Sequence, residues 1–174
     1  MLQFQLGADL DVLVLRHGEA GNRVSVPAMD TKRPLTQSGR KEIEEVASAM
    51  RDRLNLKFDR IASSPLARAF QTAEIVEKAY GGASKLETWD ELRPEGSRPE
   101  LERKLSKLRR DARVLLVGHE PYLSTLMAGI IAGGGPARIS LKKGGLAKLR
   151  ISSFSPRATG ELRWLLTPKQ LKKL

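Results

Sequence analysis

The chain has 174 residues, 40% of them hydrophobic, with no cysteine and a formal net charge of +11 at pH 7. Without cysteine, the protein cannot use disulfides, thiolate catalysis, zinc ribbons or iron–sulfur clusters. No stretch approaches the roughly 18 uncharged apolar residues of a membrane span, and the start lacks a signal-peptide pattern. We therefore expect residues 1–174 to form a single domain, soluble and cytoplasmic, with no membrane partner.

The positive charge favours acidic partners, which include phosphates, acidic protein surfaces and nucleic acid. Only 5% of the residues are aromatic, and the 31 lysines and arginines are spread along the chain. Proteins that bind single-stranded nucleic acid need aromatic stacking platforms and clustered basic residues. We therefore expect a solvated basic surface and no nucleic-acid partner.

Apolar runs of strand length alternate with helical patterns along the chain. The runs predict strands at residues 12–15, 58–62, 85–89, 114–117, 145–152 and 161–166. This alternation predicts an α/β protein, here a three-layer α/β/α sandwich with a mostly parallel central sheet. Strands 12–15 and 114–117 are apolar throughout, which is typical of strands covered by helices on both faces.

Helical periodicity is clearest in residues 38–54, for which Thr36 is a suitable N-cap. A second helix is predicted to start with Ser64 as its N-cap and Pro65 as its first residue, and to end at the pair of glycines after Tyr80. Two more helices are predicted at residues 99–111 and 122–132.

The chain has only two histidines, and each lies just past one of the two most apolar strands. His17 follows strand 12–15, and His119 follows strand 114–117. Open α/β sheets bind ligands at the carboxyl ends of their strands, so both histidines are expected at one site. The alternative is that each is a loop residue whose ring is satisfied by a backbone carbonyl.

Two imidazoles without a thiol limit the chemistry to acid–base catalysis, attack by nitrogen, or packing. Arg16 precedes His17, and its guanidinium can donate paired hydrogen bonds to phosphoryl oxygens. Gly18 leaves room for a ligand to approach the backbone. Arg68, in the first turns of the second helix, could face the same anion, although most arginines on helix surfaces are only solvated. The pattern favours a phosphate site.

Four segments in order, "LRHGE", "RPLTQSG", "SSPLARAFQTAEI" and "VGHEP", resemble the histidine phosphatase superfamily, which has the phosphoglycerate-mutase-like fold. The short chain, "DELRPEG" and the ending "GELRWLLTPKQLKK" are most similar to the SixA-type phosphohistidine phosphatases. The segment between Thr72 and Gly118 is too short for a large cap over the site.

The resemblance implies that His17 is a nucleophile that becomes transiently phosphorylated, without a cofactor or metal. It also implies that Arg16, Arg68 and His119 hold the phosphoryl oxygens. Transfer to nitrogen would split hydrolysis into two easier steps, and the cations would offset the phosphoryl charge. Arg33 is a further candidate phosphate ligand, with a structural role as the alternative.

A catalytic acid is harder to place. Glu91 in "WDELRPEG" is near the family's usual acid position, and Asp30 and Glu19 are rivals. Many members carry an asparagine six residues after the nucleophile, whereas Asn22 comes after five, so it receives no role. A phosphoramidate needs less help from an acid than a phosphate ester, because its bond to nitrogen is labile once the leaving imidazole is protonated.

These observations predict a phosphohydrolase that removes phosphate from phosphohistidine in a protein partner. Its basic surface would steer acidic phosphotransfer domains towards an open site. One alternative is a phosphatase for small phosphate monoesters, and another is a phosphate- or phosphoprotein-binding module without turnover. The partner and the oligomeric state are not predicted.

Overall fold

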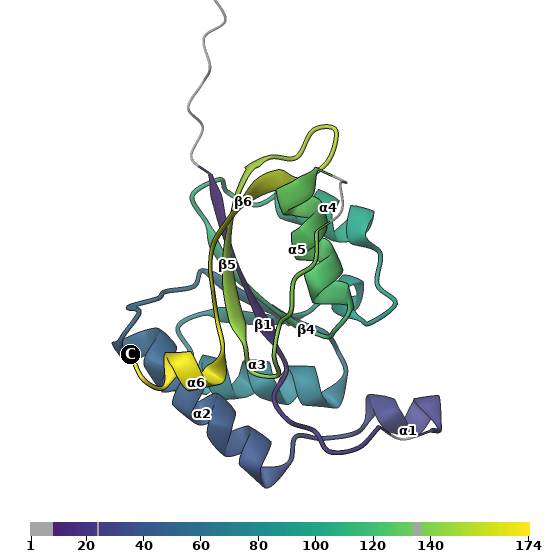
Figure 1. Ribbon diagram of the computed structural model, residues 1–174, viewed down its shortest axis with the longest axis vertical. Coiled ribbons are helices and arrows are strands. Elements are labelled where there is room, and N and C mark those ends of the chain that lie inside the picture. The colour runs from purple at the N-terminus through teal and green to yellow at the C-terminus, as the bar shows by residue number, and fades with distance from the viewer. Residues whose placement is uncertain (1–8, 24, 134–136) are drawn as a thin grey trace, which may run out of the picture.

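The computed structural model describes residues 9–23, 25–133 and 137–174. They build a six-stranded sheet in the order β3-β2-β4-β1-β5-β6, with helices on both faces (Figure 1). The strands are β1 (Leu10–Arg16), β2 (Arg60–Ser63), β3 (Lys85–Thr88), β4 (Arg113–Gly118), β5 (Leu146–Ser153) and β6 (Thr159–Leu166). All six predicted strands are confirmed, with small differences at their ends.

The sheet is mixed, and its parallel part contains the two central strands. β3, β2, β4 and β1 pair in parallel, whereas β5 pairs antiparallel with both β1 and β6. Parallel neighbours need long crossover connections, which the helices supply, while a short turn is enough between β5 and β6. The prediction of a mostly parallel sheet is confirmed.

Alternate side chains of β1 enter two separate cores, because successive residues of a strand point to opposite faces. Val12 and Val14 pack in the core built with α4 (Arg98–Ser106) and α5 (Tyr122–Ala132). Leu13 and Leu15 pack in the core built with α2 (Gln37–Asp52), α3 (Ala67–Ala79) and α6 (Pro168–Leu171). The three predicted layers and the double burial of β1 are therefore confirmed, and β4 is buried in the same way.

The start of α2 follows the prediction. The Thr36 side chain accepts a hydrogen bond from the Gly39 N–H at 3.0 Å and so caps the helix. The apolar face of α2 is buried against the sheet at Ile43, Val46, Ala47 and Met50.

The predicted start of α3 is wrong. The helix begins at Ala67 after an extended N-cap residue, Leu66, and has no side-chain cap. The chain is still paired with β4 at Ser64, whose N–H donates to the carbonyl of Val117 at 2.9 Å, so it cannot yet coil. The Ser64 hydroxyl instead contacts His119.

The helix predicted at 99–111 ends early. α4 stops at Ser106, and the charged residues that follow form turns before the chain enters β4. These residues offer little apolar surface to bury, so packing does not extend the helix. Three short helices were not predicted: α1 (Pro27–Thr31), the 3₁₀ turn η1 (Asp90–Leu92) and α6. None of the helices in the described ranges is long and apolar enough to cross a membrane.

Candidate functional site

Two buried histidines meet at the carboxyl ends of the two central strands. His17 follows β1 and His119 follows β4, and the last residues of these strands, Arg16 and Gly118, are register partners. The two ring centroids are 5.1 Å apart, and the residues are 7% and 2% exposed. The predicted convergence of the histidines at one edge of the sheet is confirmed.

The hydrogen bonds of His17 determine which ring nitrogen carries the hydrogen. Nδ1 lies 2.7 Å from the carbonyl oxygen of Gly18. Because a carbonyl only accepts, Nδ1 must donate, and Nε2 keeps its lone pair. The Nε–H of Arg68 donates to this Nε2 at 3.3 Å. Nε2 is therefore the atom that His17 can offer to an electrophile.

The surroundings of His17 keep its ring neutral. Burial lowers the pKa of His17 to about 4, and three nearby guanidinium groups act in the same direction. These groups belong to Arg68, Arg16 and Arg33. The hydrogen bond to the carbonyl of Gly18 opposes the shift without cancelling it. At pH 7 the imidazole is thus uncharged, and its free nitrogen is able to act as a nucleophile.

His119 is hydrogen-bonded on one side of its ring. Nε2 lies 2.9 Å from Oγ of Ser64, whereas the buried Nδ1 has no hydrogen-bond partner among the described residues. Burial lowers the pKa of His119 to about 2, and the neighbouring His17 contributes to the shift. A buried polar atom without a partner is costly, so Nδ1 marks a position suited to a polar ligand.

Arg68 is the cation in direct contact with His17. It lies in the first turn of α3, is only 6% exposed, and aims its Nε at His17 Nε2. Its Nη1 donates to the carbonyl oxygen of Asp30 at 2.9 Å and lies 3.4 Å from that residue's Oδ2. Arg68 is therefore held in place beside the nucleophilic nitrogen and is not a solvated surface arginine.

Arg16 is held by the loop that precedes β5. Its Nη1 donates to the carbonyl of Leu141 at 2.9 Å, and its buried Nε has no hydrogen-bond partner in the described part of the chain. The N–H of Gly144 lies 3.1 and 3.2 Å from the carbonyls of Arg16 and His17. The loop thus fixes the end of β1 while one donor of Arg16 stays uncommitted.

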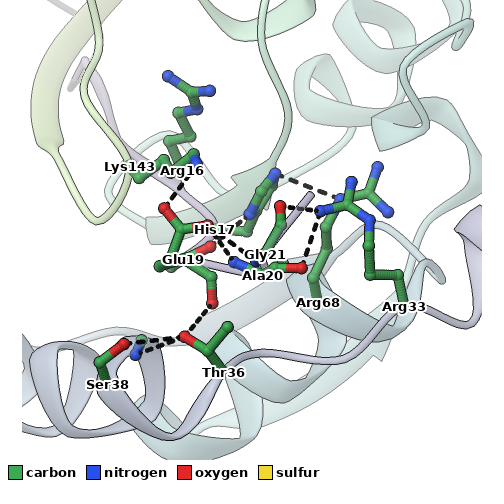
Figure 2. A network of polar contacts seen from close by, with 12 residues as sticks. Arg16, His17, Glu19, Ala20, Gly21, Arg33, Thr36, Ser38, Arg68 and Lys143 are labelled. Atoms are coloured by element: carbon green, nitrogen blue, oxygen red, sulfur yellow. Dashed lines mark hydrogen bonds and ion pairs between the residues drawn. The ribbon is translucent and has the colours of Figure 1, made fainter. Parts of the chain in front are cut away.

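Arg33 braces the loop that follows His17. Its Nη1 donates to the carbonyls of Ala20 and Gly21, both at 3.0 Å, and its Nε donates to Oδ1 of Asp30 at 2.8 Å. Figure 2 shows Arg33 beside Arg68, on the opposite side of His17 from Glu19 and Lys143. The Asp30 carboxylate, predicted as a rival acid, therefore holds two guanidinium groups in position.

Gly18 is required by helix packing. A Cβ at this position would lie 2.7 Å from Cγ1 of Ile43 in α2. Close packing against α2 thus accounts for this glycine, which the sequence suggested was needed for a ligand to approach the backbone. The buried hydroxyl of Thr72 in α3 also reaches the loop, accepting from the Gly18 N–H at 3.2 Å.

The acid candidates Glu91 and Glu19 both bind lysines. Glu91, in η1, has its carboxylate oxygens 2.9 and 3.1 Å from Nζ of Lys104, and no described contact joins it to either histidine. Glu19 contacts Nζ of Lys143 at 2.6 Å, and this bond is the main cause that holds the pKa of Glu19 below its usual value. Glu19 is thus ionised at neutral pH and cannot donate a proton there. Asn22, which received no role from the sequence, is exposed in the loop that follows His17.

The site combines groups that can bind an anion with an uncharged imidazole nitrogen that is able to act as a nucleophile. A neutral imidazole lies among guanidinium groups, and two buried nitrogens, Nε of Arg16 and Nδ1 of His119, have no hydrogen-bond partner within the described ranges. The same ranges hold no cluster of three or more His, Asp or Glu side chains that could bind a metal. A tetrahedral oxyanion matches the charge and donors of this site.

Ser64 and Thr72 both contact residues of the site, although the sequence did not assign either of them to it. Ser64 was assigned to a helix cap, although it contacts His119, and Thr72 was quoted only as part of a motif. For Thr72, the one signal in the sequence was its spacing. It lies one helical turn after Arg68 and therefore on the same face of the helix. Its hydroxyl also donates to the Arg68 carbonyl at 2.7 Å.

Comparison with known proteins agrees with this geometry. Residues 12–95 match the model of the histidine phosphatase superfamily (branch 1). The chain is 36% identical over 169 residues to an uncharacterized protein of Picosynechococcus sp., covering 93% of this chain and 99% of that protein.

Solved structures show the same similarity. The protein histidine phosphatase SixA complexed with tungstate superimposes with a TM-score of 0.76 at 26% identity, covering 92% of this chain and 99% of that chain. A SixA-type protein of Agrobacterium tumefaciens shares the fold, with a TM-score of 0.70 at 24% identity and coverage of 91% and 97%. The paired strand-end histidines, the arginines around them and these similarities lead to one conclusion: the chain belongs to the histidine phosphatase superfamily.

Proposed function

We propose that this phosphatase removes the phosphoryl group from phosphohistidine in a partner protein and carries it transiently on His17. One observation carries the proposal: the buried, neutral His17 presents an Nε2 lone pair beside the guanidinium of Arg68. Arg16 and His119 each add a buried nitrogen without a partner among the described residues. Nucleophile and anion ligands thus come from the ends of neighbouring elements.

In the first step, Nε2 of His17 forms a bond to phosphorus while the substrate's bond between phosphorus and nitrogen breaks. The departing imidazole nitrogen takes up a proton from solvent or from the predicted acid, Glu91. Arg16, Arg68 and His119 hold the phosphoryl oxygens, whose negative charge the guanidinium groups offset. The hydrogen on Nδ1 of His17 stays bonded to the Gly18 carbonyl, which stabilises the phosphorylated ring.

In the second step, a water molecule attacks phosphorus and the bond to Nε2 breaks. Inorganic phosphate leaves, the second hydrogen of the water passes to phosphate or solvent, and neutral His17 is regenerated. Arg33 supports both steps by bracing residues 20 and 21 and by its charge. Its direct contact with phosphate stays a prediction.

The proposed substrate class is supported by the similarity to SixA and by the contacts of the candidate acids. The similar SixA structure holds tungstate, which like phosphate is a tetrahedral oxyanion. Glu19 is ionised, and the Glu91 carboxylate binds Lys104. A leaving imidazole needs less assistance from an acid than an alkoxide, so such a site suits phosphohistidine better than an ester. Glu91 stays the predicted acid.

A partner protein with an acidic surface fits the net charge of +11. If charge steers the encounter, kcat/KM for a phosphohistidine protein falls as ionic strength rises, whereas kcat/KM for a small aryl phosphate changes less. Equal salt dependence for both substrates would contradict steering. The cytoplasmic location stays a prediction, which cell fractionation would check.

The deciding experiment compares three substrates: a phosphohistidine protein, a phosphoserine peptide and an aryl phosphate. Phosphate release is measured for the parent protein and for His17→Ala, each with EDTA and with added Mg²⁺. We expect rapid phosphate release from phosphohistidine that EDTA does not affect. In His17→Ala the rate of release should fall by more than about a thousandfold. An acid-labile phosphoryl group should be trapped on His17 of the parent.

Other outcomes favour different functions. Faster release from the esters would assign the protein to small phosphate monoesters. Tight phosphate binding without release from any substrate would assign it to phosphate or phosphoprotein binding. Loss of activity with EDTA, restored by Mg²⁺, would contradict the metal-independent mechanism.

A further inference from the structure

Ser64 lies where β2 leads into α3, and its hydroxyl is in contact with His119. The residue is fully buried, and its N–H donates to the carbonyl of Val117 in β4. Its Oγ lies 2.9 Å from Nε2 of His119 and 3.3 Å from the N–H of Leu66. Pro65 has no N–H, so Leu66 provides the first backbone donor after Ser64.

Counting donors and acceptors assigns the hydrogens of this contact. The Leu66 N–H can only donate, so it occupies a lone pair of Ser64 Oγ. The hydroxyl hydrogen then needs an acceptor, and among the described contacts of Oγ the other group is Nε2 of His119. If Ser64 donates, Nε2 is unprotonated. The neutral ring must then carry its hydrogen on Nδ1.

We propose that Ser64 is a positioning residue that holds His119 in the tautomer with hydrogen on Nδ1. Nδ1 is the buried nitrogen that lacks a partner in the described part of the chain, so this tautomer turns it into a donor available to a phosphoryl oxygen. In the other tautomer, Nδ1 would present a lone pair to that oxygen and repel it. A neutral imidazole can bind an anion only through the correct nitrogen.

The inference rests on the proposed function only where it names the phosphoryl group as the ligand. The tautomer itself belongs to the resting protein. Because the chain has only two histidines, a sample labelled with ¹⁵N-histidine gives signals from two rings, which the His17→Ala variant assigns. We expect Nε2 of His119 to show the chemical shift of an unprotonated nitrogen and Nδ1 that of a protonated one.

Ser64→Ala removes the donor, so we expect His119 to change to a mixture of tautomers or to protonation on Nε2. Tungstate affinity and kcat/KM should then fall about tenfold to a hundredfold, as is typical when a group that orients a histidine is lost. Ser64→Thr keeps the hydroxyl and should restore the parent tautomer. Ser84→Ala is the matched control, because Ser84 is also buried but its hydroxyl binds the Phe58 carbonyl far from the site.

Each outcome decides the inference. Protonation of His119 on Nε2 in the parent protein would overturn it, and this measurement does not require any variant to fold. An unchanged tautomer in a folded Ser64→Ala protein would overturn it as well. If the tautomer depends on Ser64 and tungstate binds, but no substrate is hydrolysed, the positioning role holds and the proposed catalytic function fails.

Discussion

Basic side chains lie at both ends of the parallel strands, but they are exposed at one end and buried at the other. At the amino ends of β2, β3 and β4, a cavity of about 590 Å³ is lined by Arg51, Arg109 and Arg113 among others. Arg51 and Arg109 are 47% and 71% exposed, and each lies within 3 Å of a neighbouring aspartate. At the carboxyl ends, Arg68 is buried and its Nε contacts a histidine.

The difference shows that a cavity and positive charge do not by themselves locate a site for phosphate. Exposed ion pairs at the amino end largely cancel in solvent and contribute little. At the carboxyl end, burial strengthens the interactions, and the arginines are oriented by carbonyl groups and, for Arg33 and Arg68, also by the shared carboxylate of Asp30. Two unpartnered buried nitrogens beside a neutral histidine, Arg16 Nε and His119 Nδ1, distinguish the carboxyl end from this cavity, where the unpartnered buried group among the described residues is the hydroxyl of Tyr80.

The sharpest test replaces one arginine from each end. Arg68→Ala should lower kcat/KM for phosphohistidine about a hundredfold to a thousandfold, because it removes a preorganised donor from the transferring group. Arg109→Ala, at the amino end, should leave kcat/KM unchanged. Steady-state kinetics on both variants, with thermal unfolding as a check of folding, gives the answer. Equal losses would remove the distinction between the two ends.

A substitution of Glu91 tests whether the carboxyl end of the sheet supplies a catalytic acid. Glu91→Gln should slow phosphohistidine hydrolysis by less than about tenfold, but slow any ester hydrolysis about a hundredfold. The ester loss should grow as the pKa of the leaving group rises, which a series of aryl phosphates measures. Glu100→Gln, on the exposed start of α4, is the control. A uniform loss across the series would show that Glu91 does not protonate the leaving group.

Asp30 tests how far the arginines depend on their orientation. Asp30→Asn keeps the carbonyl contact with Arg68 but weakens the ion pairs with both Arg33 and Arg68. We expect kcat/KM to fall about tenfold, as for other groups that orient a ligand-binding side chain. Asp59→Asn changes the corresponding carboxylate at the amino end, beside Arg109, and should have no effect. Kinetics indistinguishable between the two variants would contradict the role of Asp30.

The smallest effect concerns the pH dependence of the buried histidines. Their folded pKa values of about 4 and about 2 lie below the ordinary 6.5. Below about pH 6.5 the unfolded chain therefore binds more protons than the folded protein does. Folding stability should therefore decrease from pH 6.5 towards pH 4, by at most about 1.4 kcal/mol per pH unit for each histidine.

Two measurements check this expectation. Neither ring should titrate near pH 6.5 in an NMR titration of the folded protein. Denaturant unfolding of His17→Ala should show a weaker loss of stability on acidification than the parent. A ring that titrates near pH 6.5 would show that the carboxyl end is solvated, as the amino end is.

Much of the fold could be read from local patterns. The apolar runs at 12–15 and 114–117 predicted two strands buried on both faces, because only covered strands tolerate such continuous hydrophobicity. The same runs placed His17 and His119 at one edge of the sheet. The start of α3 could not be predicted this way, because a contact between Ser64 and β4, distant in sequence, keeps the chain extended.

The sequence by itself determined the six strands, the presence of the four longer helices, the sheet type and the identity of the residues at the strand ends, since these depend on local periodicity and on short motifs. Only the tertiary structure determined which of those side chains contact one another. It placed Asp30 between two arginines, bound Glu91 to Lys104, and directed the Ser64 hydroxyl at His119. Apart from the local pair of Asp30 and Arg33, each of these contacts joins separate segments, and its geometry depends on packing that no local pattern encodes.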